Sequence, residues 1–78
     1  SPAPAIPDED GRLKIARDAL RQLPRRDRLL LALRAHGLSY REIAAASGIR
    51  TASVGRLLAR AADRWSAVIE RQANERGE

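Results

Sequence analysis

The sequence predicts an all-helical domain of four helices, on the basis of three observations. Apolar residues recur at helical spacing along most of the chain, and no segment shows the alternation expected of a strand. The apolar residues, 44% of the chain, are almost all Ala, Leu, Ile and Val, with no Phe and no Met. A short helical pattern ends at Gly48, and another begins almost at once. At 78 residues the chain has room for one compact domain.

The first two helices are separated by a proline. The first is expected from about Glu9 to Gln22, because acidic residues at its start favour a helix N-terminus. Its apolar positions are Leu13, Ala16, Leu20 and Leu23. Pro24 ends this helix and can be the first residue of the next, where its missing N–H costs nothing. The second helix ends near His36, with Gly37 as its C-terminal cap.

Leu31 lies apart from the other leucines of the second helix. Leu29, Leu30 and Leu33 fall on one arc, and Leu31 points away from them by roughly 150° at about 100° per residue. One interpretation is that the domain packs around both sides of this helix. The other is that Leu31 is an apolar contact for another protein.

A capping box predicts the start of the third helix. The Ser39 hydroxyl can accept a hydrogen bond from the Glu42 N–H, while the Glu42 carboxylate accepts one from the Ser39 N–H. This helix is short, since Gly48 can take the left-handed conformation that ends a helix. The fourth helix is expected from near Thr51 to about Gln72.

The fourth helix has an apolar side and a basic side. The apolar side consists of Val54, Leu57, Leu58, Ala61, Trp65, Val68 and Ile69. The other side consists of Ala52, Arg56, Ala59 and Arg60, with Ser53 and Arg64 at its edge. Because Trp65 is in register with the apolar side, we expect it to anchor the core.

Residues 40–60 are expected to form a helix-turn-helix. This motif needs a tight corner, a small residue where two helices approach, and apolar residues that lock the second helix. Gly48 supplies the corner and Ala44 the small residue. The locking residues are Ile49, Val54 and either Leu57 or Leu58. The expected result is a module similar in size to winged-helix or homeodomain modules, with no sheet.

A helix-turn-helix places the N-terminal end of its second helix in the major groove of DNA. The candidates for reading base edges are Arg50, Thr51, Ala52, Ser53 and Arg56. Arg56 is the foremost, because an arginine bidentate to guanine contributes roughly 1–3 kcal/mol of discrimination. The candidates for phosphate contacts are Ser39, Arg41, Arg60 and Arg64.

The charge of the chain fits an acidic partner. The formal net charge is +5, and 14 of the 15 basic residues are arginine, the side chain best shaped for phosphates and base edges. No acidic residue occurs between Gly48 and Ala62. The alternative is an ordinary solvated basic face.

Several classes of function find no support. The chain has no cysteine, which excludes disulfides and thiolate metal sites, and we expect no metal, cofactor or small-molecule substrate. His36 is the only histidine, no carboxylate pair is placed against it, and no catalytic residue is expected. Apolar runs are too short for a membrane span. We expect a proline-rich linker over 1–8, the domain over 9–73 and a disordered tail over 74–78.

A set of short segments carries a resemblance to a known family. They are Leu23-Pro24, Arg28, Gly37-Leu38-Ser39-Tyr40-Arg41-Glu42-Ile43-Ala44, Gly48-Ile49, Ser53-Val54 and Leu58-Ala59-Arg60-Ala61. Residues 19–64 resemble region 4 of sigma-70 family sigma factors, most of all the extracytoplasmic-function (ECF) group. The resemblance implies a cytoplasmic bacterial protein that recognises the −35 promoter element and docks on the beta-flap of RNA polymerase. It also implies that an anti-sigma factor can bind the domain, and that the proline-rich start links it to a promoter-melting region 2.

The sequence departs from that family in two places. Gly55 and Leu57 stand where the family usually has Lys and Arg, so a promoter preference does not carry over. The stretch from Arg28 to Gly37 is about one residue shorter than in most ECF members. In that respect it is closer to LuxR/NarL-type response-regulator domains, which share the Gly-Leu-Ser-x-x-Glu-Ile-Ala pattern. The Leu23-Pro24 pair and the Leu58-Ala59-Arg60-Ala61 ending favour the sigma family.

A third hypothesis is a protein-interaction module that has kept the fold and lost DNA reading. Gly55 motivates it, because a glycine weakens a helix interior by about 1 kcal/mol relative to alanine and offers no side chain to a base.

Overall fold

The computed structural model describes residues 11–75, which form four helices and no strand. The helices are α1 (Arg12–Arg21), α2 (Arg25–Ala35), α3 (Tyr40–Ser47) and α4 (Thr51–Glu75). The prediction of an all-helical, four-helix domain is confirmed for this part of the chain. None of these helices is both long and apolar enough to cross a membrane.

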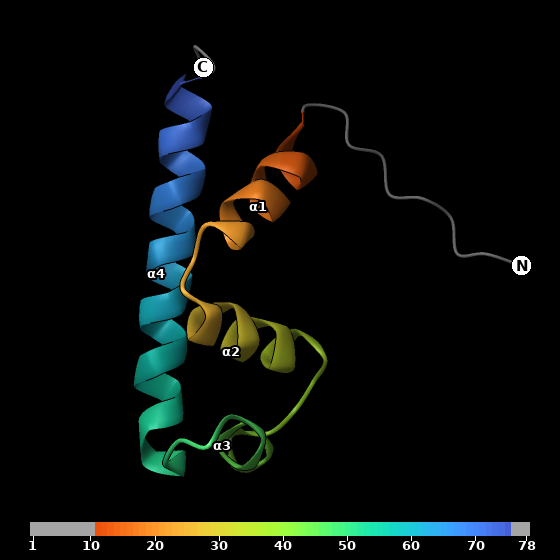
Figure 1. Ribbon diagram of the computed structural model, residues 1–78, viewed down its shortest axis with the longest axis vertical. Helices are drawn as coiled ribbons and strands as arrows, with labels where there is room; N and C mark the ends of the chain where they lie inside the picture. The colour runs from red at the N-terminus through yellow and green to blue at the C-terminus, as the bar shows by residue number, and fades with distance from the viewer. Residues whose placement is uncertain (1–10, 76–78) are drawn as a thin grey trace, which may run out of the picture.

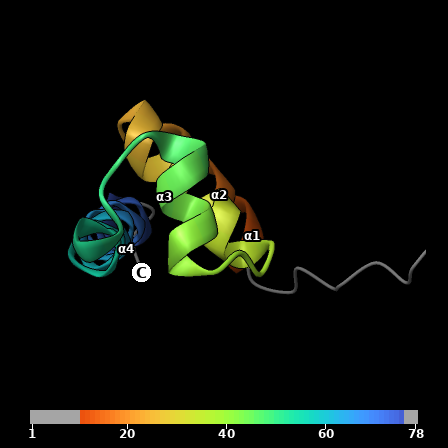
Figure 2. The ribbon, with the colours of Figure 1, turned by 90° about the horizontal axis from the view of Figure 1, so that it is seen from below.

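The long helix α4 is the element against which the other three helices pack (Figure 1). It runs from the corner beside α3, past α2, to its contact with α1. In the view from below, α4 is seen end-on, with α3 and α2 beside it (Figure 2). α2 also contacts α3, so the end of the domain near the corner is built from three helices.

One cluster of buried residues joins α2, α3 and α4. Its members are Leu30, Ile43, Ala44, Val54 and Leu58. Half-buried apolar residues packed against it are Leu33, Leu38, Ile49 and Leu57. The predicted locking residues Ile49 and Val54 therefore belong to this cluster or pack on it, as do both alternatives for the third, Leu57 and Leu58. We call it the corner cluster.

A second cluster joins α1, the turn that follows it and the C-terminal half of α2 to the C-terminal half of α4. Its buried members are Ala19, Leu23 and Val68. Leu20, Leu31, Trp65 and Ile69 are half-buried and pack against them. The Trp65 Nε1–H donates a hydrogen bond to the Ala16 carbonyl oxygen at 2.8 Å, so the indole ties α4 to α1. The prediction that Trp65 anchors the core is confirmed. We call this group the α1 cluster.

The two clusters explain the position of Leu31. Leu30 belongs to the corner cluster and Leu31 packs on the α1 cluster, so the domain packs around both sides of α2. The structure thus agrees with the first interpretation of Leu31, in which the domain packs around both sides of the helix.

Helix ends differ from the predictions by a few residues. The predicted start of the first helix at Glu9 lies outside the described residues, and α1 begins at Arg12. Pro24 is the N-cap of α2 rather than its first helical residue. The helix α4 continues to Glu75 and so includes two residues that were predicted to lie in the tail. Its last turn is packed, because Gln72 and Ala73 are half-buried.

Candidate DNA-binding interface

The α3 N-terminus has the predicted capping box. The Glu42 backbone N–H donates to the Ser39 Oγ at 3.1 Å, and the Ser39 N–H donates to the Glu42 Oε1 at 2.8 Å. The hydrogen bond from the Ser39 backbone lowers the pKa of the Glu42 carboxyl below its ordinary value, and a hydrogen bond with the Ser39 side chain lowers it further. The capping box thus satisfies N–H groups at the start of α3 and keeps Glu42 ionised.

The corner between α3 and α4 is made by Gly48. Its φ of 75° lies in the left-handed region, which glycine adopts without a steric penalty. The N–H groups of Gly48 and Ile49 both donate to the Ala44 carbonyl oxygen, at 2.9 and 3.2 Å. The chain then enters α4 at Thr51. The helix-turn-helix predicted over residues 40–60 is confirmed as a structure.

The candidate base-reading residues lie at the start of α4. Arg50 precedes the helix, and the other four fall in its first two turns. Arg50, Thr51, Ala52 and Arg56 are exposed, whereas Ser53 is half-buried. Four of the five are therefore fully available to a ligand at this end of the domain.

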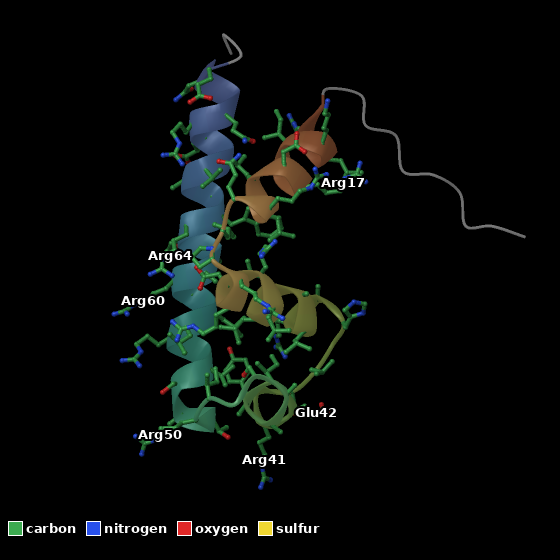
Figure 3. All side chains as sticks on the ribbon, viewed as in Figure 1. Arg17, Arg41, Glu42, Arg50, Arg60 and Arg64 are labelled. Atoms are coloured by element: carbon green, nitrogen blue, oxygen red, sulfur yellow. The ribbon has the colours of Figure 1, made fainter. Side chains whose placement is uncertain are left out.

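The candidate phosphate-binding arginines are not all equally free. The side chains of Arg41, Arg50 and Arg60 point away from the packed helices (Figure 3). By contrast, the Arg64 Nη1 donates to the Asp27 Oδ2 at 2.8 Å. The Asp27 side chain is 3% exposed and that of Arg64 is 50% exposed. Arg64 therefore neutralises a buried carboxylate of α2, a role that the sequence analysis did not predict.

A signal for Asp27 was present in the spacing of α2. Asp27 is four residues after Leu23 and three before Leu30, and both of these leucines are buried. A carboxylate in register with two buried leucines needs a cationic partner. The partner is 37 residues away, and helical periodicity does not identify it.

Gly55 lies at a close approach between α3 and α4. A Cβ atom at Gly55 would lie 3.3 Å from the Cε2 of Tyr40 and 3.8 Å from its hydroxyl oxygen. The Arg34 guanidinium carbon in turn lies over the Tyr40 ring, 5.2 Å from its centroid. A larger residue at position 55 would therefore require the Tyr40 ring to shift by a few tenths of an ångström.

Comparison with models of known protein families identifies the family of this domain. A family model described as Sigma-70, region 4 matches residues 13–64, two thirds of the chain. The chain belongs to the sigma-70 region 4 family. Searches of curated proteins and of solved structures gave no significant match.

Membership of the family confirms the resemblance seen in the sequence and decides between the two families that share its central motif. A sigma-70 region 4 domain binds the −35 promoter element as part of a sigma factor, and the family is not enzymatic. Its partners are promoter DNA and RNA polymerase. The match covers α1 from its second residue, α2, α3 and the first 14 residues of α4.

Proposed function

We propose that this region 4 domain reads the −35 element with the N-terminal end of α4. In this arrangement Arg50, Thr51, Ala52, Ser53 and Arg56 face base edges in the major groove. The observation that carries the proposal is the corner itself, since Gly48 turns the chain so that exposed Arg50 and Arg56 lie at the free end of a helix. Arg56 is the principal base reader, because it can bind guanine through two hydrogen bonds.

The phosphate contacts come from both sides of the corner. Arg41 and the Ser39 hydroxyl act from α3, together with the backbone N–H groups that open that helix. Arg60 acts from α4. Arg64 lies about 20 Å along α4 from Thr51, at about 1.5 Å per residue, and one of its N–H groups already bonds Asp27. Its contribution to DNA affinity is therefore the smallest of the four.

We assign polymerase docking to the apolar side chains that α2 leaves exposed or half-buried. The partner surface is the beta-flap of RNA polymerase in the bacterial cytoplasm, and an anti-sigma factor competes for the same domain. Leu31 contributes its exposed part, and Leu29, which is 41% exposed, adds apolar area on α2. Because Leu31 also packs in the α1 cluster, Leu29→Asp is the cleaner test of docking: it should weaken polymerase binding and leave the thermal midpoint unchanged.

The experiment on DNA reading compares the affinities of the chain for duplexes that vary at each position of a −35 element. The Arg56→Ala variant should lose about 5- to 150-fold of its preference at one base position, equivalent to roughly 1–3 kcal/mol. Arg17→Ala is the matched control, since Arg17 is exposed on α1, far from the corner (Figure 3). This control should bind like the parent chain.

The salt dependence of binding supplies a second readout. Neutralising several phosphates makes the logarithm of the affinity fall steeply with the logarithm of salt concentration. An affinity that is the same at about 50 and about 200 mM salt would contradict the proposed DNA contact.

A further inference from the structure

We propose that Tyr40 is a base-reading residue, and that its phenol takes the place of the side chain that α4 lacks at Gly55. This inference rests on the proposed function, because it assumes that the N-terminal half of α4 faces the major groove. It adds a residue from α3, the first helix of the motif, to the surface that chooses the promoter.

The first observation is where the phenol lies. A Cβ built on Gly55 would meet the Cε2, hydroxyl oxygen and Cζ atoms of Tyr40 at 3.3, 3.8 and 3.9 Å. These three atoms belong to the outer end of the tyrosine side chain. The end of Tyr40 therefore lies directly beside the place where a side chain of residue 55 would begin, and a Cβ atom there would require the ring to shift by a few tenths of an ångström.

The second observation is the position of Gly55 on α4. Ala52 and Ala59 are three residues before and four residues after it, so they are its neighbours along one side of the helix. Both alanines are exposed and have no polar side-chain atom. Arg56, the principal candidate reader, is the next residue of α4 and is exposed. At this edge of the reading surface, the polar side-chain group next to Gly55 is the phenol that α3 supplies.

The third observation is that the hydroxyl is available. Tyr40 is 43% exposed. Within residues 11–75, its hydroxyl makes no hydrogen bond. A phenol both donates and accepts hydrogen bonds, so it can pair with acceptors such as guanine O6 or thymine O4 on a base edge.

The fourth observation is that the ring is held in place from two elements. The close approach to Gly55 positions it against α4, and the Arg34 guanidinium from α2 lies over it at 5.2 Å from the centroid. Arg34 is itself fixed, because its Nη1 donates to the Leu38 carbonyl oxygen at 2.9 Å. A side chain oriented before binding pays less entropy on contact and discriminates better between ligands.

The experiment measures base preference at every position of a −35 duplex library for the parent chain, Tyr40→Phe, Gly55→Ala and Arg56→Ala. Tyr40→Phe keeps the ring and removes the hydroxyl, so it should lose about two- to tenfold of the preference at one base position, the effect of one hydrogen bond. That position should differ from the one affected by Arg56→Ala. Gly55→Ala should alter preference at the same position as Tyr40→Phe, since its Cβ would shift the phenol by a few tenths of an ångström from the orientation it has in the parent chain.

Other outcomes overturn the inference. An equal loss of affinity on every sequence after Tyr40→Phe would mean that the hydroxyl binds a phosphate, and an unchanged profile would mean that it contacts no DNA. If Arg56→Ala changes preference and Tyr40→Phe does not, this inference fails and the proposed function stands. If neither the parent chain nor any variant discriminates between sequences, the proposed function fails. Thermal midpoints of Tyr40→Phe and the parent should agree, which excludes unfolding as the cause of any change.

Discussion

The carboxylate of Asp27 shows how one residue connects two helices that are distant in the sequence. It is 2% exposed as a residue, and its Oδ2 accepts from Arg64 at 2.8 Å. A buried carboxylate without a partner is costly, since it loses water and gains no compensating charge. The contribution of Arg64 to stability therefore depends on the free-energy cost of burying the Asp27 carboxylate without a partner.

Replacing Arg64 with alanine should destabilise the domain by about 1–3 kcal/mol. We expect less than the full cost of breaking a buried ion pair, because half of the Arg64 side chain is exposed and water can reach the vacated space. Urea unfolding measures the change. Arg60→Ala, one turn earlier and exposed, should shift stability by less than about 0.5 kcal/mol. Equal stabilities for the two variants would show that Asp27 does not depend on Arg64.

The Glu42 capping box should give the domain a pH-dependent stability. The folded-state pKa of Glu42 is lowered by hydrogen bonds from Ser39, so its contribution is complete above the unfolded-state pKa. The contribution is lost as the pH falls through the lower, folded-state pKa. Glu42→Gln can keep a side-chain acceptor for the Ser39 N–H but does not titrate. Chemical unfolding of both proteins as a function of pH should show a steeper acid loss for the parent chain.

At the scale of the element, helix ends that are set by local hydrogen bonds were predictable from the sequence. The capping box starts α3 where it was expected, and Gly48 ends it. Gly37, at φ 87°, ends α2 as predicted. The Gly37 N–H donates to the Arg34 carbonyl oxygen, and the Leu38 N–H donates to the Leu33 carbonyl oxygen. These motifs need only residues that are close in sequence.

Features that depend on contacts between helices were not predictable in the same way. The helix α4 continues beyond the predicted end, and Gln72 and Ala73 in its last turns are half-buried. Gly55 was interpreted as a weakness of the recognition helix, and its close approach to Tyr40 of α3 was not visible in the sequence. The exposure of Arg56 agrees with its predicted place opposite the apolar side of the fourth helix, because helical periodicity reports exposure but does not report partners.

Gly48→Ala should destabilise the domain by about 1–2 kcal/mol, because an L-residue resists the left-handed conformation. No steric clash adds to this cost, since nothing lies within 4 Å of a Cβ at Gly48. Gly48→Asn should cost less, because asparagine tolerates that conformation better. Thermal and urea unfolding of the two variants supply the comparison. A Gly48→Ala variant as stable as the parent chain would show that the corner can take another backbone conformation.

At the scale of the whole molecule, the domain has two sets of core contacts along one helix. The corner cluster lies where α4 meets α2 and α3, and the α1 cluster lies where α4 meets α1. No residue belongs to both clusters. The helices α2 and α4 contribute to each, so the fold is continuous while its side-chain packing is divided.

This division predicts additive effects of mutations in different clusters. Val54→Ala in the corner cluster and Val68→Ala in the α1 cluster should each cost about 2 kcal/mol, and the double variant should cost their sum within about 0.5 kcal/mol. Val54→Ala combined with Ile43→Val, which share one cluster, should deviate from additivity. Double-mutant cycles from urea unfolding measure the coupling energy of each pair of substitutions. A coupling energy for Val54 and Val68 as large as that within one cluster would show that the core acts as one unit.

The separation of the two clusters also bears on how such a domain diverges after gene duplication. Arg50, Arg56 and the pair of Tyr40 and Gly55 lie at the corner, and none of them packs in the α1 cluster. If these residues read the promoter as proposed, substitutions among them would change which promoters a paralogue serves while the packing of α1 against α4 is inherited intact.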